Sequence, residues 1–363
     1  MKKNKNYVDL KDQPVPEGQH LLEVDDLKMY FHTEDGVVRA VDGVSYTLDR
    51  GETLGVVGES GSGKSVTAMT IMVLISMPPG KIEGGDVRYR GRSILEMTEE
   101  EMQHIRGNDI AMIFQDPMTS LNPVYKIGKQ VGEGLRLHRG YSKQEALKRA
   151  TELLDLVGIP EPEKRVNEYP HQFSGGMRQR VMIAMALACD PDILIADEPT
   201  TALDVTIQAQ IIELMQEMQE KNGNAIIMIT HDLGVVADMA DKIMVMYAGR
   251  PVEFGTAEEI FYESRHPYTW GLIRSIPEQA IEEKKPLTPI HGNPPSLMNL
   301  PEGCVFSPRC PYATDKCRKQ RPERVVTESG HYSACHYSGD PEFLKNAPET
   351  SRTRKDSKKG GEA

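Results

Sequence analysis

The chain has 363 residues, of which 39% are hydrophobic and 27% are charged, a balance typical of a soluble globular protein with one large domain and a small appended one. Its formal net charge of −11 at pH 7 argues against general nucleic-acid binding, which favours a basic surface. Apolar runs fall short of the roughly 20 residues that span a bilayer, and the basic start leads into acidic, proline-containing sequence. We therefore expect neither a membrane-spanning segment nor a signal peptide, and predict a cytoplasmic protein that docks on other chains if it serves a membrane process.

The first part of the chain is expected to be rich in β-structure. Mixed apolar and polar positions with β-branched residues predict strands at 21–31 and 41–48, with an Asp-Gly turn signal between them. Residues 53–57 form a short apolar run, as a buried strand would, and residues 65–75 have a helical composition. A buried strand should thus lead through a short loop into a helix.

Two capping boxes mark helix starts in the middle of the chain. Thr98 is followed by Glu101, and Ser142 is followed by Glu145, so each serine or threonine and its glutamate can satisfy one another's backbone donors. Between these two helices, residues 109–114 are predicted to form another buried strand.

From residue 180 onward helix and strand alternate, which predicts parallel strands joined by crossover helices. The expected elements are helices at 180–188, 207–218 and 233–240 and strands at 193–196, 225–229 and 242–246. Around residue 256 this pattern gives way to proline-rich sequence, which we interpret as a separate, loop-rich module. The charged final residues, 341–363, are predicted to be disordered.

A glycine-rich segment, Gly58-Glu59-Ser60-Gly61-Ser62-Gly63-Lys64-Ser65, matches G-x-x-x-x-G-K-[ST] and lies between the apolar strand and the helix. Its glycines allow the backbone N–H groups to wrap a phosphate, and the helix N-terminus adds a favourable dipole. Lys64 should reach the β- and γ-phosphates, and the Ser65 hydroxyl should ligate Mg²⁺. The strand–loop–helix context argues against a chance match. The predicted ATP-binding residues of this loop are Gly58, Ser60, Gly61, Ser62, Gly63, Lys64, Ser65 and Val66.

An apolar strand at 193–196 is followed by two carboxylates, Asp197 and Glu198. A buried strand would deliver Asp197 beside the phosphate loop, where it can hold Mg²⁺ directly or through water. Glu198 can orient and polarise the attacking water as a general base. An exposed acidic turn would look the same in isolation, so this prediction depends on the phosphate loop.

A Ser-Gly-Gly turn, Ser174-Gly175-Gly176, precedes a helix and offers a second anion site, with a hydroxyl, free N–H groups and a helix dipole. A fold that already has one γ-phosphate cradle does not need another for the same nucleotide. The simplest resolution is that this turn caps a nucleotide held by a partner chain. We therefore predict a dimer with ATP sandwiched at the interface.

Residues 21–260 resemble the ATP-binding-cassette (ABC) ATPase family. The segment from Phe173 to Met177 resembles its signature motif, usually Leu-Ser-Gly-Gly-Gln, with Phe and Met at the outer positions here. The resemblance implies an α/β fold in which a P-loop ATPase domain combines a parallel core sheet, an antiparallel β subdomain and a helical subdomain at about 116–180. It also implies that Ser174, Gly175 and Gly176 contact ATP in trans.

The same resemblance implies roles for further residues. Gln115 matches the Q-loop glutamine, which touches Mg²⁺ and faces the membrane subunits. His231 matches the switch histidine that contacts the γ-phosphate, and Ala202-Leu203-Asp204 matches the D-loop that crosses the dimer interface, so Asp204 would contact ATP in trans. Phe31 stands where an aromatic stacks on adenine, with an ordinary core aromatic as the alternative. The implied catalytic residues are Lys64, Glu198 and His231, and the implied Mg²⁺ ligands are Ser65, Gln115 and Asp197.

The C-terminal part resembles the tail of the oligopeptide, dipeptide and nickel importer ATPases. The segments that carry this resemblance are His266-Pro267-Tyr268-Thr269, Gly303 to Cys310, Gln172 to Arg180 and Thr200 to Thr206. It implies a C-terminal module at 261–340, after the cassette and a short N-terminal extension at 1–20. The implied function is ATP hydrolysis that powers peptide import, with nickel or another small solute left open as cargo.

The same resemblance implies that this chain is the D-type of two different ATPase subunits. Its other implied partners are two transmembrane permease subunits and, indirectly, an extracellular peptide-binding protein. The chain would then lie at the cytoplasmic face of the membrane.

Four of the five cysteines, Cys304, Cys310, Cys317 and Cys335, fall within the last sixty residues with a C-x5-C-x6-C-x17-C spacing. Disulfides are disfavoured in a reducing cytoplasm, so these thiols suggest a metal centre that staples a small module. Zinc usually shows a more closely spaced pair, and the wider spacing favours a [4Fe–4S] cluster. Zinc and free structural cysteines are the alternatives, and His331 and His336 are possible substitute ligands.

Three rival functions are weighed against transport. Soluble cassette ATPases of translation or DNA repair usually carry two cassettes or a long coiled coil, and this sequence has one cassette and no sustained heptads. Exporters commonly fuse a membrane domain to the cassette. A structural partner with a weak ATPase site would be expected to have incomplete motifs, whereas the motifs here are complete.

Overall fold

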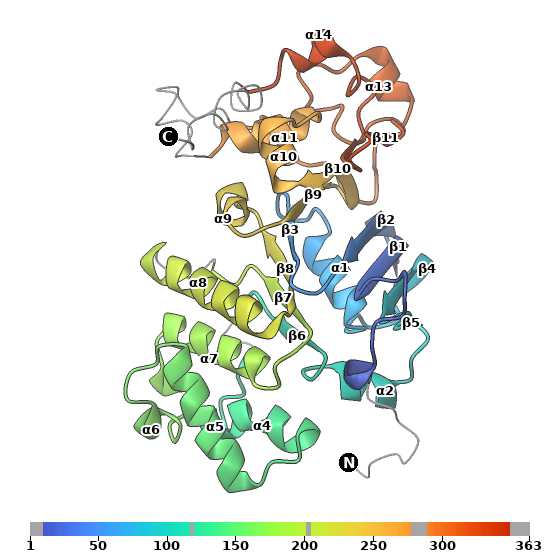
Figure 1. The fold of residues 1–363 in the computed structure, drawn as a ribbon. Coiled ribbons are helices and arrows are strands. Elements are labelled where there is room, and N and C mark those ends of the chain that lie inside the picture. Colours follow the sequence, from blue (N-terminus) through green and yellow to red (C-terminus); the bar gives the residue numbers. More distant parts are fainter. Residues whose placement is uncertain (1–9, 117–119, 201–204, 277–288, 349–363) are drawn as a thin grey trace.

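The computed structural model describes residues 10–116, 120–200, 205–276 and 289–348. Figure 1 shows an α/β molecule whose strands form two sheets, with helices packed around them. The strands are β1 (Leu22–Thr33), β2 (Gly36–Leu48), β3 (Thr53–Val57), β4 (Gly80–Tyr89), β5 (Arg92–Ser93), β6 (Ile110–Ile113), β7 (Ile193–Asp197), β8 (Ala225–Thr230), β9 (Lys242–Tyr247), β10 (Arg250–Thr256), β11 (Val325–Val326) and β12 (Tyr332–Ser333).

The helices in the described part of the chain fall between and after these strands. They are α1 (Lys64–Ile71), α2 (Glu99–Ile105), α4 (Ile127–His138), α5 (Lys143–Leu156), α6 (Pro162–Arg165), α7 (Gly175–Leu187), α8 (Val205–Asn222), α9 (Leu233–Ala237), α10 (Ala257–Tyr262), α11 (Pro267–Arg274), α13 (Asp315–Lys319) and α14 (Pro341–Leu344), with short 3-10 turns at Leu10–Asp12 and Pro170–Gln172. None of the described helices combines the length and apolar character needed to cross a membrane.

The larger sheet has the order β11-β12-β10-β9-β3-β8-β7-β6. Its central strands pair in parallel, β9 with β3, β3 with β8, β8 with β7 and β7 with β6, which confirms the prediction from alternating helices and strands. The smaller sheet, β2-β1-β4-β5, is antiparallel. A parallel core sheet, an antiparallel β region and a group of helices are therefore all present, as the sequence predicted.

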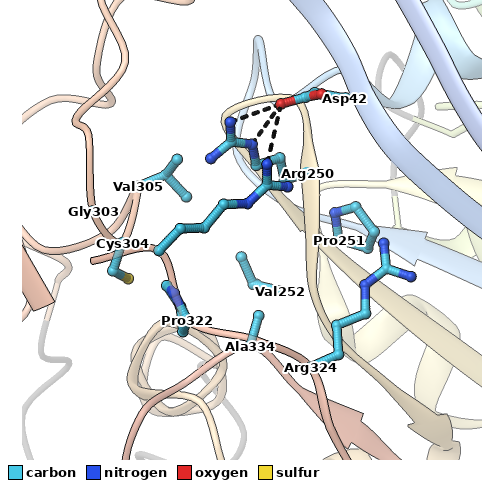
Figure 2. Close-up of a pocket in the computed structure, with 11 residues that line it drawn as sticks. Asp42, Arg250, Pro251, Val252, Gly303, Cys304, Val305, Pro322, Arg324 and Ala334 are labelled. Carbon is cyan, nitrogen blue, oxygen red and sulfur yellow. Dashed lines mark hydrogen bonds and ion pairs between the residues drawn. The ribbon is translucent and has the colours of Figure 1, made fainter. Parts of the chain in front are cut away.

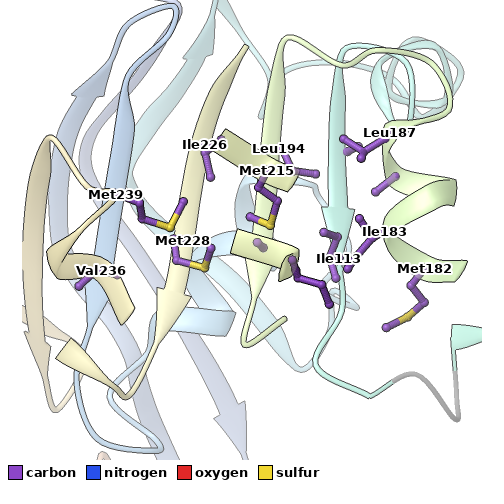
Figure 3. Close-up of a cluster of buried hydrophobic side chains, with 14 of the residues drawn as sticks. Ile113, Met182, Ile183, Leu187, Leu194, Met215, Ile226, Met228, Val236 and Met239 are labelled. Carbon is purple, nitrogen blue, oxygen red and sulfur yellow. The ribbon is translucent and has the colours of Figure 1, made fainter. Parts of the chain in front are cut away.

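The two faces of the larger sheet bury different cores, because successive strand residues point in opposite directions. Ile193 and Ile195 of β7 pack into the core shared with α1 and the antiparallel sheet. Leu194 and Ala196 pack on the other face, into the core formed with α7, α8 and α9. Figure 3 shows this second core, in which Leu194 lies among side chains such as Ile183 and Met215. Helices α1 and α7 thus lie on opposite faces of the sheet.

Helices α4 to α7 form a bundle at one end of the molecule (Figure 1). The capping boxes predicted at Thr98 with Glu101 and at Ser142 with Glu145 are confirmed. The helix predicted at 180–188 begins earlier, at Gly175, because Ser174 caps its N-terminus. Apolar periodicity did not extend to that first turn, whose residues are small or polar.

The sequence missed strands β4 and β10, as well as the two-residue strands β5, β11 and β12. In β4, intermediate and exposed residues alternate over much of its length, so it lacks the apolar run that marked the other strands. Strand β10 lies at the boundary where proline-rich sequence begins, and it runs antiparallel to β9. It was missed because the preceding helix–strand alternation led us to expect parallel strands only.

The C-terminal segment, defined here as residues 257–348, completes the edge of the larger sheet. Strand β12 pairs with β10, with Glu253 opposite Ser333 and Phe254 opposite Tyr332. The predicted disorder from residue 341 is wrong for α14, where Phe343 packs against Trp270 with ring centroids 5.3 Å apart. The predicted cassette and the predicted C-terminal module contribute strands to the same sheet. The sheet therefore does not separate them, and the boundary between them stays a prediction.

Candidate active site

The glycine-rich loop joins β3 to α1, as the sequence predicted. Gly63 precedes the helix with φ of 99°, and a Cβ there would lie 2.3 Å from the Ala40 carbonyl oxygen, so only glycine fits. Lys64 follows, with 5% of its surface exposed, and its Nζ donates hydrogen bonds to the carbonyl oxygens of Gly58 (2.7 Å) and Glu59 (3.0 Å). Burial lowers the pKa of Lys64. The loop therefore wraps around its own lysine.

Ser65 and Asp197 meet where α1 begins and β7 ends. The Ser65 hydroxyl donates to Asp197 Oδ1 over 2.9 Å. Asp197 is 4% exposed, and burial raises its pKa, with the neighbouring Glu198 carboxylate adding to the rise. A hydroxyl beside a buried carboxylate is an oxygen donor set of the kind that suits Mg²⁺, and a cation there would offset the cost of ionising Asp197.

Glu198 lies between two other predicted site residues. Its backbone adopts φ of 47°, a left-handed conformation that ends the strand. Gln115 Nε2 donates to Glu198 Oε2 over 2.9 Å, and His231 Nδ1 lies 3.4 Å from Glu198 Oε1. The three residues follow β6, β7 and β8, whose carboxyl ends meet at one edge of the sheet. A carboxylate held from both sides can orient a water molecule.

The Ser-Gly-Gly turn lies away from the phosphate loop of its own chain. Ser174 caps α7 by accepting a hydrogen bond from the Met177 N–H over 3.3 Å, and both Ser174 and Gly175 are exposed. Helix α7 lies on the opposite face of the sheet from α1. The structure thus presents the turn on the outside of the molecule. Asp204 and the rest of the predicted D-loop lie outside the described residues.

Phe31 is half-buried on β1 and packs at the edge of the core around α1. The adjacent Tyr30 is oriented elsewhere, since its hydroxyl donates to Asp42 over 2.8 Å. Because this hydrogen bond holds the Tyr30 side chain at Asp42, Phe31 is the better candidate for stacking on adenine.

The four C-terminal cysteines line one small cavity, together with His336. None of them is disulfide-bonded. Burial raises the pKa of the Cys304 thiol, of Cys310 to about 11 and of Cys335 to about 12. Within the described parts of the chain, no group of three or more His, Cys, Asp or Glu side chains stands in a position to hold a metal ion. The four cysteines thus line one cavity, while the cluster or metal predicted for them stays a prediction.

The two histidines considered as substitute ligands differ. His331 is buried and its Nε2 lies 3.0 Å from Glu253 Oε1, so it faces a carboxylate on β10. His336 lines the cysteine cavity, and its Nε2 donates to the Gln320 carbonyl over 2.9 Å. Of these two histidines, His336 is therefore the one that lies at the cysteine cavity.

A second pocket lies where the C-terminal segment meets the cassette strands (Figure 2). Asp42 of β2 accepts from Arg250 Nε (2.8 Å) and Nη2 (2.7 Å), and Arg321 Nη1 lies 3.9 Å from the same carboxylate. Burial alone would raise the pKa of Asp42, but hydrogen bonds from Arg250 and Tyr30 outweigh it and hold the pKa below its ordinary value. The cluster thus joins β2 to β10 through Arg250 and to the C-terminal segment through Arg321.

Sequence reasoning missed the contacts that the C-terminal segment makes with the phosphate loop. Arg309 forms an ion pair with Glu59, the second residue of the loop, and the Tyr268 hydroxyl accepts a hydrogen bond from the Glu59 N–H. Both residues lie in the segments that carried the resemblance to peptide importers. The contacts join residues 209 and 250 positions apart, so no local pattern in the sequence could have indicated them.

Comparisons with known proteins agree with this geometry. Residues 41–201 match the family described as ABC transporter, and residues 252–317 match the oligopeptide/dipeptide transporter, C-terminal region. The chain is 58% identical over 312 residues to the oligopeptide transport ATP-binding protein OppD of Bacillus subtilis (strain 168), covering 86% of this chain and 87% of the relative. It is 52% identical over 320 residues to the dipeptide transport ATP-binding protein DppD of Escherichia coli (strain K12), covering 88% and 97%.

Among solved structures, the ATP-binding cassette MJ0796 in a dimeric post-hydrolysis state bound to ADP and Pi superimposes with a TM-score of 0.60 at 29% identity. The match covers 65% of this chain and 98% of that cassette. The chain therefore belongs to the ATP-binding proteins of the oligopeptide and dipeptide ABC transporter family, and it is an ABC ATPase.

Proposed function

We propose that this chain hydrolyses ATP to power the import of di- and oligopeptides through an ABC transporter. The observation that carries the proposal is the position of Glu198, held between Gln115 and His231 at the sheet edge where Ser65 meets Asp197. The names of the relatives, oligopeptide and dipeptide transport ATP-binding proteins, support peptides as the cargo. A nickel or other small-solute importer is the alternative.

In the proposed mechanism, the N–H groups of the phosphate loop and Lys64 bind the β- and γ-phosphates of ATP. Ser65, Asp197 and Gln115 would hold Mg²⁺, which supplies charge neutralisation on the phosphate oxygens. Glu198 orients a water molecule and accepts its proton as the water oxygen bonds to the γ-phosphorus. The bond from that phosphorus to the bridging oxygen breaks, and ADP leaves with the electron pair. His231 contacts the γ-phosphate.

We further propose that the active form is a dimer of this chain with a second, homologous ATPase subunit. Ser174, Gly175, Gly176 and Asp204 would contact the nucleotide held by that partner, and the partner's equivalent residues would contact the one held here. The exposure of the Ser174 turn supports this arrangement. So does the MJ0796 cassette, which was solved as a dimer with ADP and Pi.

The proposed assembly includes two permease subunits in the membrane and, on the other side, a peptide-binding protein. This chain would lie at the cytoplasmic face, attached through the permeases. The loop after Gln115 is the candidate contact with them, since Phe114, Gln115 and Asp116 are all exposed. Closure of the ATPase dimer would pull on the permeases through that loop.

The test is peptide uptake and ATP hydrolysis by the complete transporter in proteoliposomes. Lys64→Ala should lower both by at least about 100-fold, because it removes the charge that binds the phosphates. Lys148→Ala, which changes an exposed lysine on α5, is the matched control. Normal uptake in Lys64→Ala would contradict the proposal. Uptake of Ni²⁺ without peptide uptake in the unmodified transporter would favour the alternative cargo.

For the cysteine cavity we propose a [4Fe–4S] cluster, with Zn²⁺ as the alternative. The convergence of four thiols on one cavity supports the proposal. One zinc at Zn–S distances of about 2.3 Å would draw all four sulfurs to within about 3.8 Å of one another, whereas the irons and sulfides of a cluster keep them wider apart. The C-x5-C-x6-C-x17-C spacing, wider than that of a usual zinc site, favours the cluster.

Anaerobic purification followed by metal analysis tests the cluster. We expect absorbance near ~400 nm and about four irons per chain, both lost in Cys310→Ser. Cys189→Ser, at a buried cysteine that does not line this cavity, is the matched control and should leave them unchanged. A finding of about one zinc and no iron would favour Zn²⁺ over the cluster. A finding of neither metal would mean that the four cysteines are free structural thiols.

A further inference from the structure

The C-terminal segment holds the phosphate loop at Glu59, a residue to which the ATPase mechanism gives no role. Arg309 Nη1 lies 2.5 Å from Glu59 Oε2 and Arg309 Nη2 lies 3.0 Å from Oε1, so the pair is bidentate. The Glu59 N–H donates to the Tyr268 hydroxyl over 2.8 Å. Both the side chain and the backbone of Glu59 are therefore held by residues about 210 to 250 positions later in the chain.

The guanidinium of Arg309 has all of its donors occupied. Besides the two bonds to Glu59, Nε donates to the His291 carbonyl (2.9 Å), Nη2 to the Ile290 carbonyl (3.1 Å) and Nη1 to the Tyr247 hydroxyl (3.3 Å). Five N–H groups make five hydrogen bonds, which fixes the orientation of the side chain. The Arg309 side chain is only 4% exposed, whereas that of Glu59 is 29% exposed, so the guanidinium is shielded from water on its side of the pair.

Aromatic packing braces the same residue from behind. The rings of Tyr247, Tyr268 and Phe306 lie 4.6 to 5.3 Å apart between centroids, and the Arg309 guanidinium lies 5.8 Å from the Tyr247 ring centroid. The N–H groups of Arg309 and Cys310 both donate to the Phe306 carbonyl. The turn that carries Arg309 is thus rigid and is continuous with the cysteine cavity.

Two cations hold the Glu59 residue. Lys64 Nζ donates to the Glu59 carbonyl from inside the loop, and Arg309 binds its carboxylate from outside. Without Arg309, an unpaired carboxylate would remain beside the site where the triphosphate is proposed to bind. Like charges at this range repel, and the repulsion is strong where water is partly excluded.

We propose that Arg309 is a positioning residue for the phosphate loop, through which the C-terminal segment sets the affinity of the chain for ATP. It fixes the loop at Glu59 and neutralises the charge that would oppose the nucleotide. The inference rests on the proposed function of the loop as the phosphate cradle. The C-terminal segment would then affect nucleotide binding, in addition to forming the cysteine cavity.

The test compares variants of the full-length chain, by equilibrium ATP binding, and of the assembled transporter, by kcat and KM for ATP. Arg309→Gln should raise Kd and KM about tenfold while kcat changes less than about threefold, because Asp197 and Glu198 are untouched. Arg309→Lys keeps the charge and loses the bidentate geometry, so its Kd should lie between those of the wild type and Arg309→Gln. Loss of stability alone would lower the active fraction and therefore the apparent kcat rather than raise KM.

A second substitution gives the sharper readout. Glu59→Gln added to Arg309→Gln should restore at least half of the lost affinity, on a logarithmic scale, because it removes the unpaired carboxylate. Arg318→Met is the matched control, since Arg318 is exposed and its ion pair, among the described residues, is with Asp315 in its own helix. Trp270 fluorescence, which reports on the C-terminal segment, checks folding of each variant.

The outcomes separate this inference from the proposed function. Wild-type Kd and KM in Arg309→Gln, with binding abolished in Lys64→Ala, would overturn the inference and leave the phosphate loop in place. Unchanged binding in Lys64→Ala as well would overturn the phosphate loop itself. If Arg309→Gln does not fold, Arg309→Lys decides: a Kd equal to that of the wild type overturns the role of the bidentate contact.

Discussion

The ATP site and the cysteine cavity are assembled in different ways. The polar residues of the ATP site follow adjacent parallel strands, and they hold one another through bonds such as Ser65 to Asp197 and Gln115 to Glu198. The cysteines of the cavity come from turns and short elements, and burial keeps the thiols of Cys310 and Cys335 protonated. The first site is arranged by the sheet before any ligand binds, whereas the second must lose protons to bind a metal.

The largest effect is expected from a substitution that removes the general base of the ATP site without disturbing the residues around it. Glu198→Gln keeps the size of the side chain and its position beside Gln115 but cannot accept a proton, so ATP hydrolysis by the transporter should fall about 10³-fold. ATP should remain bound and the closed dimer should accumulate, which size-exclusion chromatography with ATP would detect. The control is Glu217→Gln on the exposed face of α8. Normal hydrolysis in Glu198→Gln would remove this residue as the base.

The next effect concerns the cysteine cavity. A Cβ at Gly303 would lie 2.2 Å from the Cys317 carbonyl oxygen, which accepts a hydrogen bond from the Cys304 N–H over 2.8 Å. Gly303→Ala should therefore lower the free energy of unfolding by about 3 kcal/mol and weaken metal retention. Thermal unfolding followed by Trp270 fluorescence measures it. Gly339→Ala, where a Cβ meets open space, should change little; equal losses in the two variants would contradict the prediction.

A smaller effect depends on pH. Burial lowers the pKa of His266 from 6.5 to about 3, so between these values the unfolded chain binds a proton that the folded chain does not. Stability should therefore be complete above pH 6.5 and fall as the pH drops, by about 1.4 kcal/mol at pH 5.5.

Urea unfolding at pH 7.5 and pH 5.5 measures this loss, again through Trp270. His266→Asn keeps an acceptor for the Tyr268 N–H and removes the titration, so its loss over that pH range should be smaller by about the same 1.4 kcal/mol. An identical pH dependence in the two proteins would show that His266 titrates normally.

The smallest effect tests the edge of the nucleotide site. Phe31→Ala should raise KM for ATP by about threefold to tenfold, since a stacked aromatic contributes about 0.5–1.5 kcal/mol. Tyr30→Phe is the comparison, because it removes the hydroxyl bonded to Asp42 but leaves a ring. A KM that rises in Tyr30→Ala and not in Phe31→Ala would exchange the roles of the two residues.

Much of the ATP site could be predicted because each of its motifs is local. The phosphate loop needs only the strand before it and the helix after it, and Asp197 with Glu198 needs only the end of a buried strand. The start of α7 was less predictable, since its capping Ser174 precedes small and polar residues rather than an apolar stripe. Strand β10 was missed because it follows β9 after a two-residue turn, at the point where the alternation of helix and strand stops.

The sequence by itself determined the cassette, since the strand, helix and turn patterns that build it act over a few residues each. It also determined that four cysteines belong to one short region. Only the tertiary structure decided that this region extends the main sheet and that Arg309 reaches Glu59 about 250 residues earlier. The physical reason is that an ion pair between distant residues leaves no periodic or spacing signal along the chain; it depends on the packing of both segments against the same strands.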